Sequence, residues 1–245
     1  MADRYFSPQR IADDASTVEL TGGDAHHLSR VMRAQVGDSI VLFDGSGTEF
    51  DCRITAIAKR SVTLAVENRR HVDREASCRV VLASAIPKGD REHFLIEKAV
   101  ELGAACFIPL LTTRSVVKPK IERLERFVIE ASKQCGRTRL MEIVPPMDWN
   151  TWLHSPLRPA VCLIAHPRER LELPDDIWTT PEAAARSVCD DSPQAVGVCV
   201  GPEGGFTDAE VQAAIEAGCR PVDLGRRILR IETAALALLA RVIRD

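Results

Sequence analysis

The segment that most constrains the fold lies near the end of the chain, where an apolar run leads into a glycine-rich turn. Residues 195–200 (Ala-Val-Gly-Val-Cys-Val) are small or β-branched, which is typical of a strand buried on both faces of a parallel sheet. The turn at 201–206 follows at once, and Thr207 and Glu210 then have the spacing of a capping box. The sequence therefore predicts a central strand, a tight loop and a helix over 208–217, which are the parts of an α/β unit.

The chemistry of the turn indicates what it can bind. Gly201, Gly204 and Gly205 remove side chains where the backbone turns sharply or approaches a ligand. Their spacing fits neither the dinucleotide-binding pattern nor the P-loop, and the Glu203 carboxylate would repel a phosphate. The same carboxylate accepts hydrogen bonds from a neutral or cationic ligand. Two interpretations remain open: a ligand-binding loop, or a tight connection that needs glycine for its geometry alone.

A second segment has a similar organisation. Residues 221–224 form a short predicted strand, Gly225 ends it, and an apolar helix is predicted over 233–243. Such a helix should be buried on more than one side, either in the interior or at a subunit interface. Because both segments begin at the end of a strand, their loops are expected to converge on one small-molecule ligand.

The first part of the chain has a different texture, with short alternating segments separated by turn residues. It predicts a small β-barrel or sandwich with strands at 39–43, 49–57 and 61–66, a helical insertion at 25–33 and a charged linker at 69–75. Beyond it, strands alternate with helices, which predicts an α/β domain with a largely parallel sheet. These further elements are strands at 80–86, 106–111 and 160–165 and helices at 90–102 and 121–135.

The charge of the chain limits its binding surfaces. A net charge of -3 argues against a generally basic nucleic-acid binder, so any RNA surface must be local. Residues 114–139 hold eight basic and three acidic side chains, of which Arg123 and Arg126 are typical of a solvated helix face. Three other cations of this segment lie in loops or at a helix end, where phosphate contacts are favoured: Arg114, Lys118 and Arg137.

The cysteines do not indicate a metal site. The chain has eight, without a C-x-x-C pair or a His/Cys spacing typical of zinc, so no metal is predicted. Cys162 and Cys199 lie in strand-like runs and are expected to be small core residues. The N-terminal residues lack the apolar core of a signal peptide, and no run approaches the length of a membrane span. We therefore expect a cytoplasmic protein with reduced thiols and no membrane partner.

Several segments together carry a resemblance to one family. Residues 200–211 (Val-Gly-Pro-Glu-Gly-Gly-Phe-Thr-Asp-Ala-Glu-Val) and 224–234 (Leu-Gly-Arg-Arg-Ile-Leu-Arg-Ile-Glu-Thr-Ala) resemble signature segments of the RsmE family. Its members are 16S ribosomal RNA (uracil-N3)-methyltransferases of the SPOUT superfamily. Further similar segments lie at 26–33, 88–91, 101–103, 109–117 and 134–137. One departure is Ile231, where the family usually has threonine.

The resemblance implies a fold and an assembly that the periodicity does not reveal. The implied fold class is α/β, a SPOUT-type parallel sheet with a C-terminal trefoil knot, plus an N-terminal PUA-like β-barrel domain. The implied domains are a PUA-like RNA-binding barrel at 1–72 and a methyltransferase domain at 73–245, with the knot in about 160–245. Family members work as homodimers, which agrees with the apolar C-terminal helix.

The resemblance also implies a reaction, S-adenosyl-L-methionine (SAM)-dependent methylation of N3 of a specific uridine in 16S ribosomal RNA, within the small ribosomal subunit. Because uracil N3 carries a proton at neutral pH, some group must remove it or stabilise the anion. Arg230 is the candidate for stabilising charge on the uracil oxygens, and Glu203 or Glu232 is the candidate base. Alternatively, Arg230 pairs with one of these carboxylates and only holds the loop.

The implied contacts follow the same segments. Those to the cofactor lie at the ends of three strands: Ile164, Ala165, His166, Gly201, Pro202, Glu203, Gly204, Gly205, Leu224, Gly225, Ile228, Leu229, Arg230 and Thr233. Candidate RNA contacts are Arg10, Arg30, Arg33, Arg114, Lys118 and Arg137.

Three other functions remain open at this point. They are a SPOUT enzyme that acts on tRNA, an RNA-binding factor that has kept the fold without catalysis, and a nucleotide-dependent α/β enzyme. The missing phosphate-binding patterns disfavour the last of these.

Overall fold

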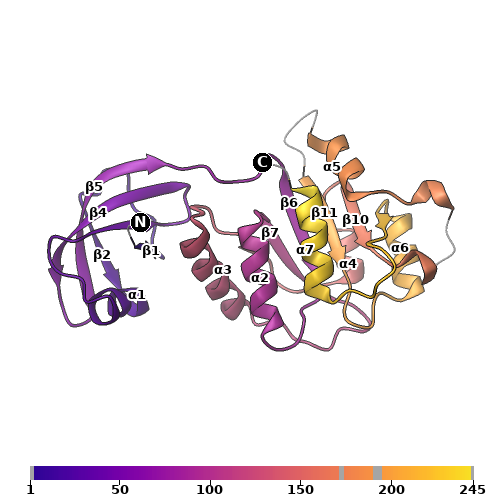
Figure 1. Cartoon of the computed structure of the whole chain (residues 1–245), viewed down its shortest axis with the longest axis horizontal. Helices are drawn as coiled ribbons and strands as arrows, with labels where there is room; N and C mark the ends of the chain where they lie inside the picture. The colour runs from indigo at the N-terminus through magenta and orange to yellow at the C-terminus, as the bar shows by residue number, and fades with distance from the viewer. Residues whose placement is uncertain (1–2, 171–173, 190–194, 244–245) are drawn as a thin grey trace. The chain divides into compact units, whose positions relative to one another are not determined.

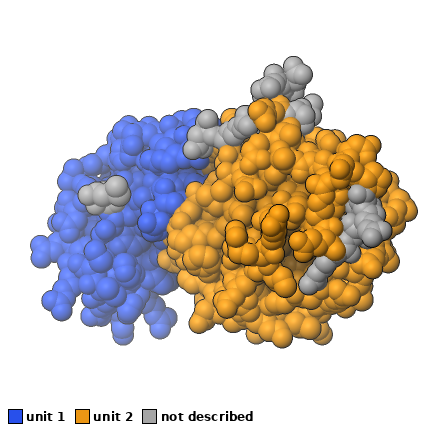
Figure 2. All heavy atoms as spheres, turned by 45° about the vertical axis from the view of Figure 1, so that its right-hand side comes forward, with its two compact units in different colours: residues 1–74, 132–140 blue, residues 75–131, 141–245 orange. Residues whose placement is uncertain are grey.

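A computed structural model describes residues 3–170, 174–189 and 195–243. The chain forms two compact units, coloured separately in Figure 2. Unit 1 comprises Met1–Arg74 and Ser132–Leu140, and unit 2 comprises Glu75–Ala131 and Met141–Asp245. None of the helices in the described ranges is long and apolar enough to cross a membrane.

Unit 1 is built on a five-stranded sheet in the order β1-β3-β4-β5-β2, of which Figure 1 labels β1, β2, β4 and β5. The β1–β3 pair is parallel and the other three pairs are antiparallel. Alternate residues such as Ile40 and Leu42 are buried, as a sheet with one face on the core requires. The strands are β1 (Arg4–Phe6), β2 (Thr17–Thr21), β3 (Ser39–Phe43), β4 (Thr48–Ile57) and β5 (Ser61–His71).

Two local predictions for this unit were wrong in part. The linker was expected to begin at residue 69, but β5 continues to His71, so the linker begins later than predicted. Its charged residues remain in the strand through cross-strand ion pairs: Arg70 Nη2 lies 2.8 Å from Asp51 Oδ1 and 3.0 Å from Glu49 Oε2. The helical insertion expected at 25–33 begins and ends earlier and is divided, with α1 at Gly22–His26 and a π-helical turn at His27–Val31.

The segment Ser132–Leu140 belongs to unit 1, whereas the sequence placed it in the second domain. Lys133 Nζ lies 2.7 Å from Asp24 Oδ1, and Thr138 Oγ1 donates a hydrogen bond to the carbonyl of Val72 (2.6 Å). Arg4 Nη2 donates to the carbonyl of Arg137 (3.2 Å). These partners are distant in sequence, which is why no local pattern indicates them.

Unit 2 contains a seven-stranded sheet, and its main path runs β12-β10-β11-β6-β7-β8. Every strand pair is parallel, which confirms the predicted parallel sheet. The predicted central strand is β11, which pairs with β10 on one side and β6 on the other. The strands are β6 (Arg79–Ser84), β7 (Cys106–Leu111), β8 (Glu142–Ile143), β9 (Met147–Asp148, beside β7), β10 (Val161–Ala165), β11 (Ala195–Val200) and β12 (Arg220–Val222).

Helices cover this sheet, as a parallel sheet requires. The last helix, α7, packs against β6 and β11 and beside α2 (Figure 1). Its buried residues, which include Ala235, Leu238 and Leu239, lie on one broad face, and Thr233 and Arg241 on the other face are exposed. The prediction of burial on more than one side was therefore wrong. The helices are α2 (Arg91–Glu101), α3 (Ile121–Cys135), α4 (Trp149–Leu153), α5 (Pro181–Cys189), α6 (Asp208–Glu216) and α7 (Ile231–Val242).

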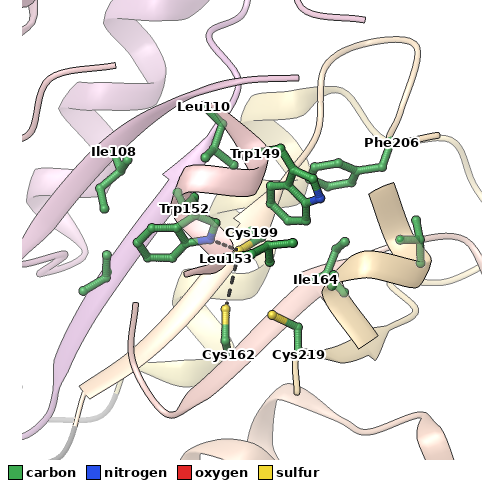
Figure 3. Close-up of a cluster of buried hydrophobic side chains, with 14 of the residues drawn as sticks. Ile108, Leu110, Trp149, Trp152, Leu153, Cys162, Ile164, Cys199, Phe206 and Cys219 are labelled. Atoms are coloured by element: carbon green, nitrogen blue, oxygen red, sulfur yellow. Dashed lines mark hydrogen bonds between the residues drawn. The ribbon is translucent and has the colours of Figure 1, made fainter. Parts of the chain in front are cut away.

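The core between the sheet, α4 and α6 is rich in aromatic and thiol groups (Figure 3). Trp152 Nε1 donates to Cys199 Sγ (3.2 Å), and Cys199 Sγ lies 3.6 Å from Cys162 Sγ. The hydrogen bond with Cys199 is the main reason that the pKa of Cys162 lies well above its usual value. Both thiols are buried in this core, which confirms their predicted packing role.

Candidate functional site

Three loops of unit 2 line one cavity of about 120 Å³, far more than a single water needs. They follow β10, β11 and β12, which are neighbours in the sheet. Because the carboxyl ends of parallel strands meet at one edge, these loops converge as predicted. The lining residues are Ala165, His166, Pro167, Val200, Gly201, Pro202, Glu203, Gly205, Phe206, Asp223, Leu224, Gly225, Arg227, Ile228, Leu229, Ile231 and Ala234.

The loop after β11 is closely packed at Gly201. A Cβ there would lie 2.9 Å from Cδ2 of Phe206 and 3.1 Å from its backbone nitrogen. The Phe206 ring is buried, with its centroid 4.6 Å from that of Trp149. Gly205 has a φ of +71°, and its N–H donates to the carbonyl of Pro202 (2.8 Å), which closes a tight turn. Glycine therefore has a packing reason at 201 and a conformational reason at 205.

Two side-chain groups anchor this loop to the segment that follows β7. Arg114 Nη1 donates to the carbonyls of Gly204 (2.7 Å) and Phe206 (3.4 Å). Glu210 completes the predicted capping box with Thr207 and also accepts from the backbone and hydroxyl of Thr113 (2.8 and 3.0 Å).

Burial of Glu210 acts to raise its pKa, but hydrogen bonds from Thr113 and Thr207 outweigh it and leave the pKa below its usual value. The carboxylate is thus stabilised in its charged form, which keeps the anchor intact at neutral pH.

The loop after β12 forms the other wall. Gly225 has a φ of +99°, and its N–H donates to Asp223 Oδ1 (3.0 Å). The backbone N–H of His166 donates to the carbonyl of Val222 (3.0 Å), which joins the ends of β10 and β12. Ile228 lines the cavity yet is 83% exposed. The wall is therefore mostly backbone and apolar surface.

Arg91, at the start of α2, lies between the two candidate carboxylates. Its Nη2 is 3.4 Å from Glu203 Oε1, and its Nη1 is 3.7 Å from Glu232 Oε2. That oxygen of Glu232 is buried and accepts no hydrogen bond from the residues that the structure describes. Within the described ranges, both carboxylates pair with Arg91, and Arg230 forms no ion pair with either of them.

The structure brings most of the predicted cofactor residues to the cavity. Those that line it are Ala165, His166, Gly201, Pro202, Glu203, Gly205, Leu224, Gly225, Ile228 and Leu229. Four do not line it: Ile164, Gly204, Arg230 and Thr233.

Each of these four has a physical reason to lie outside the lining. Ile164 points into the buried core on the side of α4 and α6. Gly204 turns its carbonyl to Arg114. Arg230 is the exposed N-cap of α7, and Thr233 is exposed on its first turn.

Sequence reasoning missed two kinds of site residue. Asp223 and Pro167 directly follow strands whose ends were correctly expected at the site, so strand position was the signal available for them. Arg91 lies in one of the segments that carry the resemblance, but nothing local indicates that its partners Glu203 and Glu232 are 112 and 141 residues away in the chain. Long-range ion pairs of this kind leave no periodic signal.

The predicted RNA contacts have different environments. Arg10, Arg30, Arg33 and Lys118 are exposed. Arg137, by contrast, is only 3% exposed, which argues against a direct phosphate contact. Arg114 already donates to the loop carbonyls. Among the residues that the structure describes, no group of three His, Cys, Asp or Glu side chains could hold a metal ion.

Comparisons with known proteins agree on one family. The RNA methyltransferase domain matches residues 74–243, and the RNA methyltransferase PUA domain matches residues 20–67. A Synechocystis sp. protein named ribosomal RNA small subunit methyltransferase E is 34% identical over 239 residues, which are 96% of this chain and 75% of that protein. The chain belongs to the RsmE family.

Solved structures support the same assignment. A Neisseria gonorrhoeae ribosomal RNA small subunit methyltransferase E, bound to SAM, is 31% identical with a TM-score of 0.81 over 98% of this chain and 96% of that chain. A Legionella pneumophila methyltransferase with SAM bound is 30% identical, with a TM-score of 0.85, over 99% of this chain and 97% of that chain. Membership of the RsmE family, its α/β fold and its PUA-like N-terminal unit are thus confirmed.

Proposed function

We propose that this protein is a SAM-dependent methyltransferase that methylates N3 of a specific uridine in 16S ribosomal RNA of the small ribosomal subunit. The observation that carries the proposal is the cavity where three strand-end loops converge, in a chain of the RsmE family. Family membership also disfavours the tRNA-directed and nucleotide-dependent alternatives.

The cavity residues fit the cofactor. Backbone groups and apolar side chains such as Leu224 and Ile228 suit a largely neutral adenosine moiety, and no cluster of cations calls for a phosphate. The Glu203 carboxylate is the charged group of the loop that favours a cation. When bound, SAM supplies a methyl group already activated on a cationic sulfur. The protein therefore has mainly to position the uracil nitrogen and exclude water.

Removal of the N3 proton requires a base and a group that stabilises the resulting negative charge, and charged side chains of the site can fill both roles. We assign the base to Glu203, because it lines the cavity and is 38% exposed. Glu232 is buried against Arg91 and is better suited to holding the start of α7. Arg230 keeps the proposed role of stabilising negative charge on the uracil oxygens, since it is exposed and forms no ion pair in the described ranges.

The remaining features of the proposal concern assembly and RNA. We assign general RNA binding to the PUA-like unit, with Arg10, Arg30 and Arg33 as phosphate contacts, and to Lys118 in the catalytic unit. A trefoil knot within about residues 160–245, a homodimer and a cytoplasmic location complete the proposal, and they rest on the family alone.

The test is direct methylation. The purified protein is incubated with SAM and with small ribosomal subunits that lack the modification, and the methylated nucleosides are mapped by mass spectrometry. We expect 3-methyluridine at one site of 16S RNA. Methylation of another base or no methylation, despite binding of S-adenosylhomocysteine, would reject the substrate; absence of cofactor binding would reject the enzyme and favour the RNA-binding factor.

A further inference from the structure

A hollow of about 180 Å³ lies on unit 2 where the segment before α2 meets the segment before α3. We call it the lysine hollow. Its charged residues are Lys88, Glu92, Lys118, Lys120 and Arg123, a balance of four cations against one carboxylate. A second shallow hollow continues from it along α3 and shares Lys120 and Arg123.

One of the four cations of the hollow, Arg123, is already paired with its carboxylate, Glu92. Arg123 Nε lies 3.2 Å from Glu92 Oε2, and the Arg123 guanidinium carbon lies over the Phe127 ring, 5.3 Å from its centroid. Within the described ranges, Lys88, Lys118 and Lys120 have no ion pair or side-chain hydrogen bond. Three ammonium groups around one hollow repel one another unless an anion lies between them.

We propose that the lysine hollow binds the sugar–phosphate backbone of the substrate RNA. This inference rests on the proposed function and adds Lys88 and Lys120 to its RNA contacts. Lysine ammonium groups contact phosphates as point charges without reading base edges, so the hollow positions RNA and does not select its sequence. The net charge of the chain is -3, so a cluster of unpaired lysines is a local positive feature. Such a feature suits a polyanion such as RNA.

The hollow is also close to the cavity. Lys88 lies three residues before Arg91, so their Cα atoms are at most about 11 Å apart. The Arg91 guanidinium in turn contacts Glu203, which lines the cavity. RNA held at the lysine hollow is therefore within a few nucleotides of the proposed methyl-transfer site.

The experiment compares charge-removing variants of the full chain. Lys88→Gln, Lys118→Gln, Lys120→Gln and their triple combination are titrated with small ribosomal subunits and with protein-free 16S RNA at several salt concentrations. The matched control is Lys98→Gln on α2, whose ammonium is already paired with Glu101 (2.7 Å) and Glu97 (2.9 Å). Affinity for S-adenosylhomocysteine is measured on every variant to confirm an intact cavity.

Each lost phosphate contact should reduce the slope of log affinity against log salt by about 0.7 to 0.9. At physiological salt this corresponds to about 5-fold weaker binding per lysine and about 100-fold for the triple variant. The Michaelis constant for subunits should rise in parallel, with little change in kcat and in S-adenosylhomocysteine affinity.

Two results would overturn the proposal: a salt slope in the triple variant equal to that of wild type or Lys98→Gln, or a loss confined to intact subunits, which would indicate a protein partner. Failure of the proposed function is distinguishable, because wild-type protein would then bind RNA with the full salt slope yet produce no 3-methyluridine.

Discussion

Replacing Gly201 by alanine tests whether close packing of the loop after β11 determines cofactor affinity. The added Cβ would lie 2.9 Å from the Phe206 ring, which is several tenths of an ångström inside ordinary contact. The ring cannot yield easily, because it is buried against Trp149. The backbone nitrogen of Phe206, at 3.1 Å, restricts movement in the same direction. The loop itself must therefore shift.

The size of the effect follows from overpacking. Forcing one methyl group into a well-packed site costs about 1–3 kcal/mol. We expect Gly201→Ala to lower the free energy of unfolding by about 2 kcal/mol. Gly201 lines the cavity, so part of this overpacking cost should also oppose ligand binding. If about 1.4 kcal/mol of it does so, the affinity for S-adenosylhomocysteine falls about tenfold.

Calorimetric titration with S-adenosylhomocysteine and denaturant unfolding measure the two effects separately. Gly204→Ala is the matched control, since the atoms nearest its Cβ would belong to the flexible Arg114 side chain, the closest at 3.1 Å, and Gly204 does not line the cavity. We expect it to change affinity less than threefold, or about 0.6 kcal/mol. Equal affinities of the Gly201→Ala variant and wild type would refute the packing argument.

Three further predictions concern charged groups. Because the pKa of Glu210 is lowered in the folded state, the ionised carboxylate stabilises the fold above about pH 4.5, and this stabilisation is lost as pH falls through the folded pKa. The Glu210→Gln variant should therefore be less stable than wild type at pH 7, and its free energy of unfolding should depend less on pH on the acid side. Denaturation from about pH 3 to 7 measures both effects. Arg91→Gln should lower stability by about 1 kcal/mol, less than a fully buried pair because Arg91 is 32% exposed, and Arg91→Lys should recover part of it in the same assay. Arg230→Ala should abolish methylation with little loss of fold, whereas Arg226→Ala, an exposed arginine of the same loop, should retain it; equal activity of the two would reject the role of Arg230.

Periodicity predicted most elements of the fold because burial on the parallel sheet selects apolar runs. The strand at 106–111 and the helix at 121–135 have the bounds expected from sequence. The short strands β1, β8 and β9 were not predicted, since two or three residues carry no period. The same limit applies to α4, whose five residues make little more than one helical turn.

The site was predictable where it depends on backbone geometry. Glycines and strand ends located the loops after β11 and β12, because positive φ values and close packing restrict residue type. The loop after β10 has no such signal, and only the family resemblance placed it at the site. The charged groups were less predictable. Arg114 was interpreted from local charge as an RNA contact, yet its guanidinium donates to carbonyls 90 and 92 residues away. A surface cation and a loop anchor look alike in sequence, and only the fold separates them.

The segment after β7 therefore connects two proposed activities. Thr113 and Arg114 anchor the cofactor loop, and a few residues later Lys118 and Lys120 line the lysine hollow. Removing charge from the lysines leaves the anchors in place, so it should affect RNA binding alone. A change that displaces the backbone of this segment should weaken RNA and cofactor binding together, because both depend on the same stretch of chain.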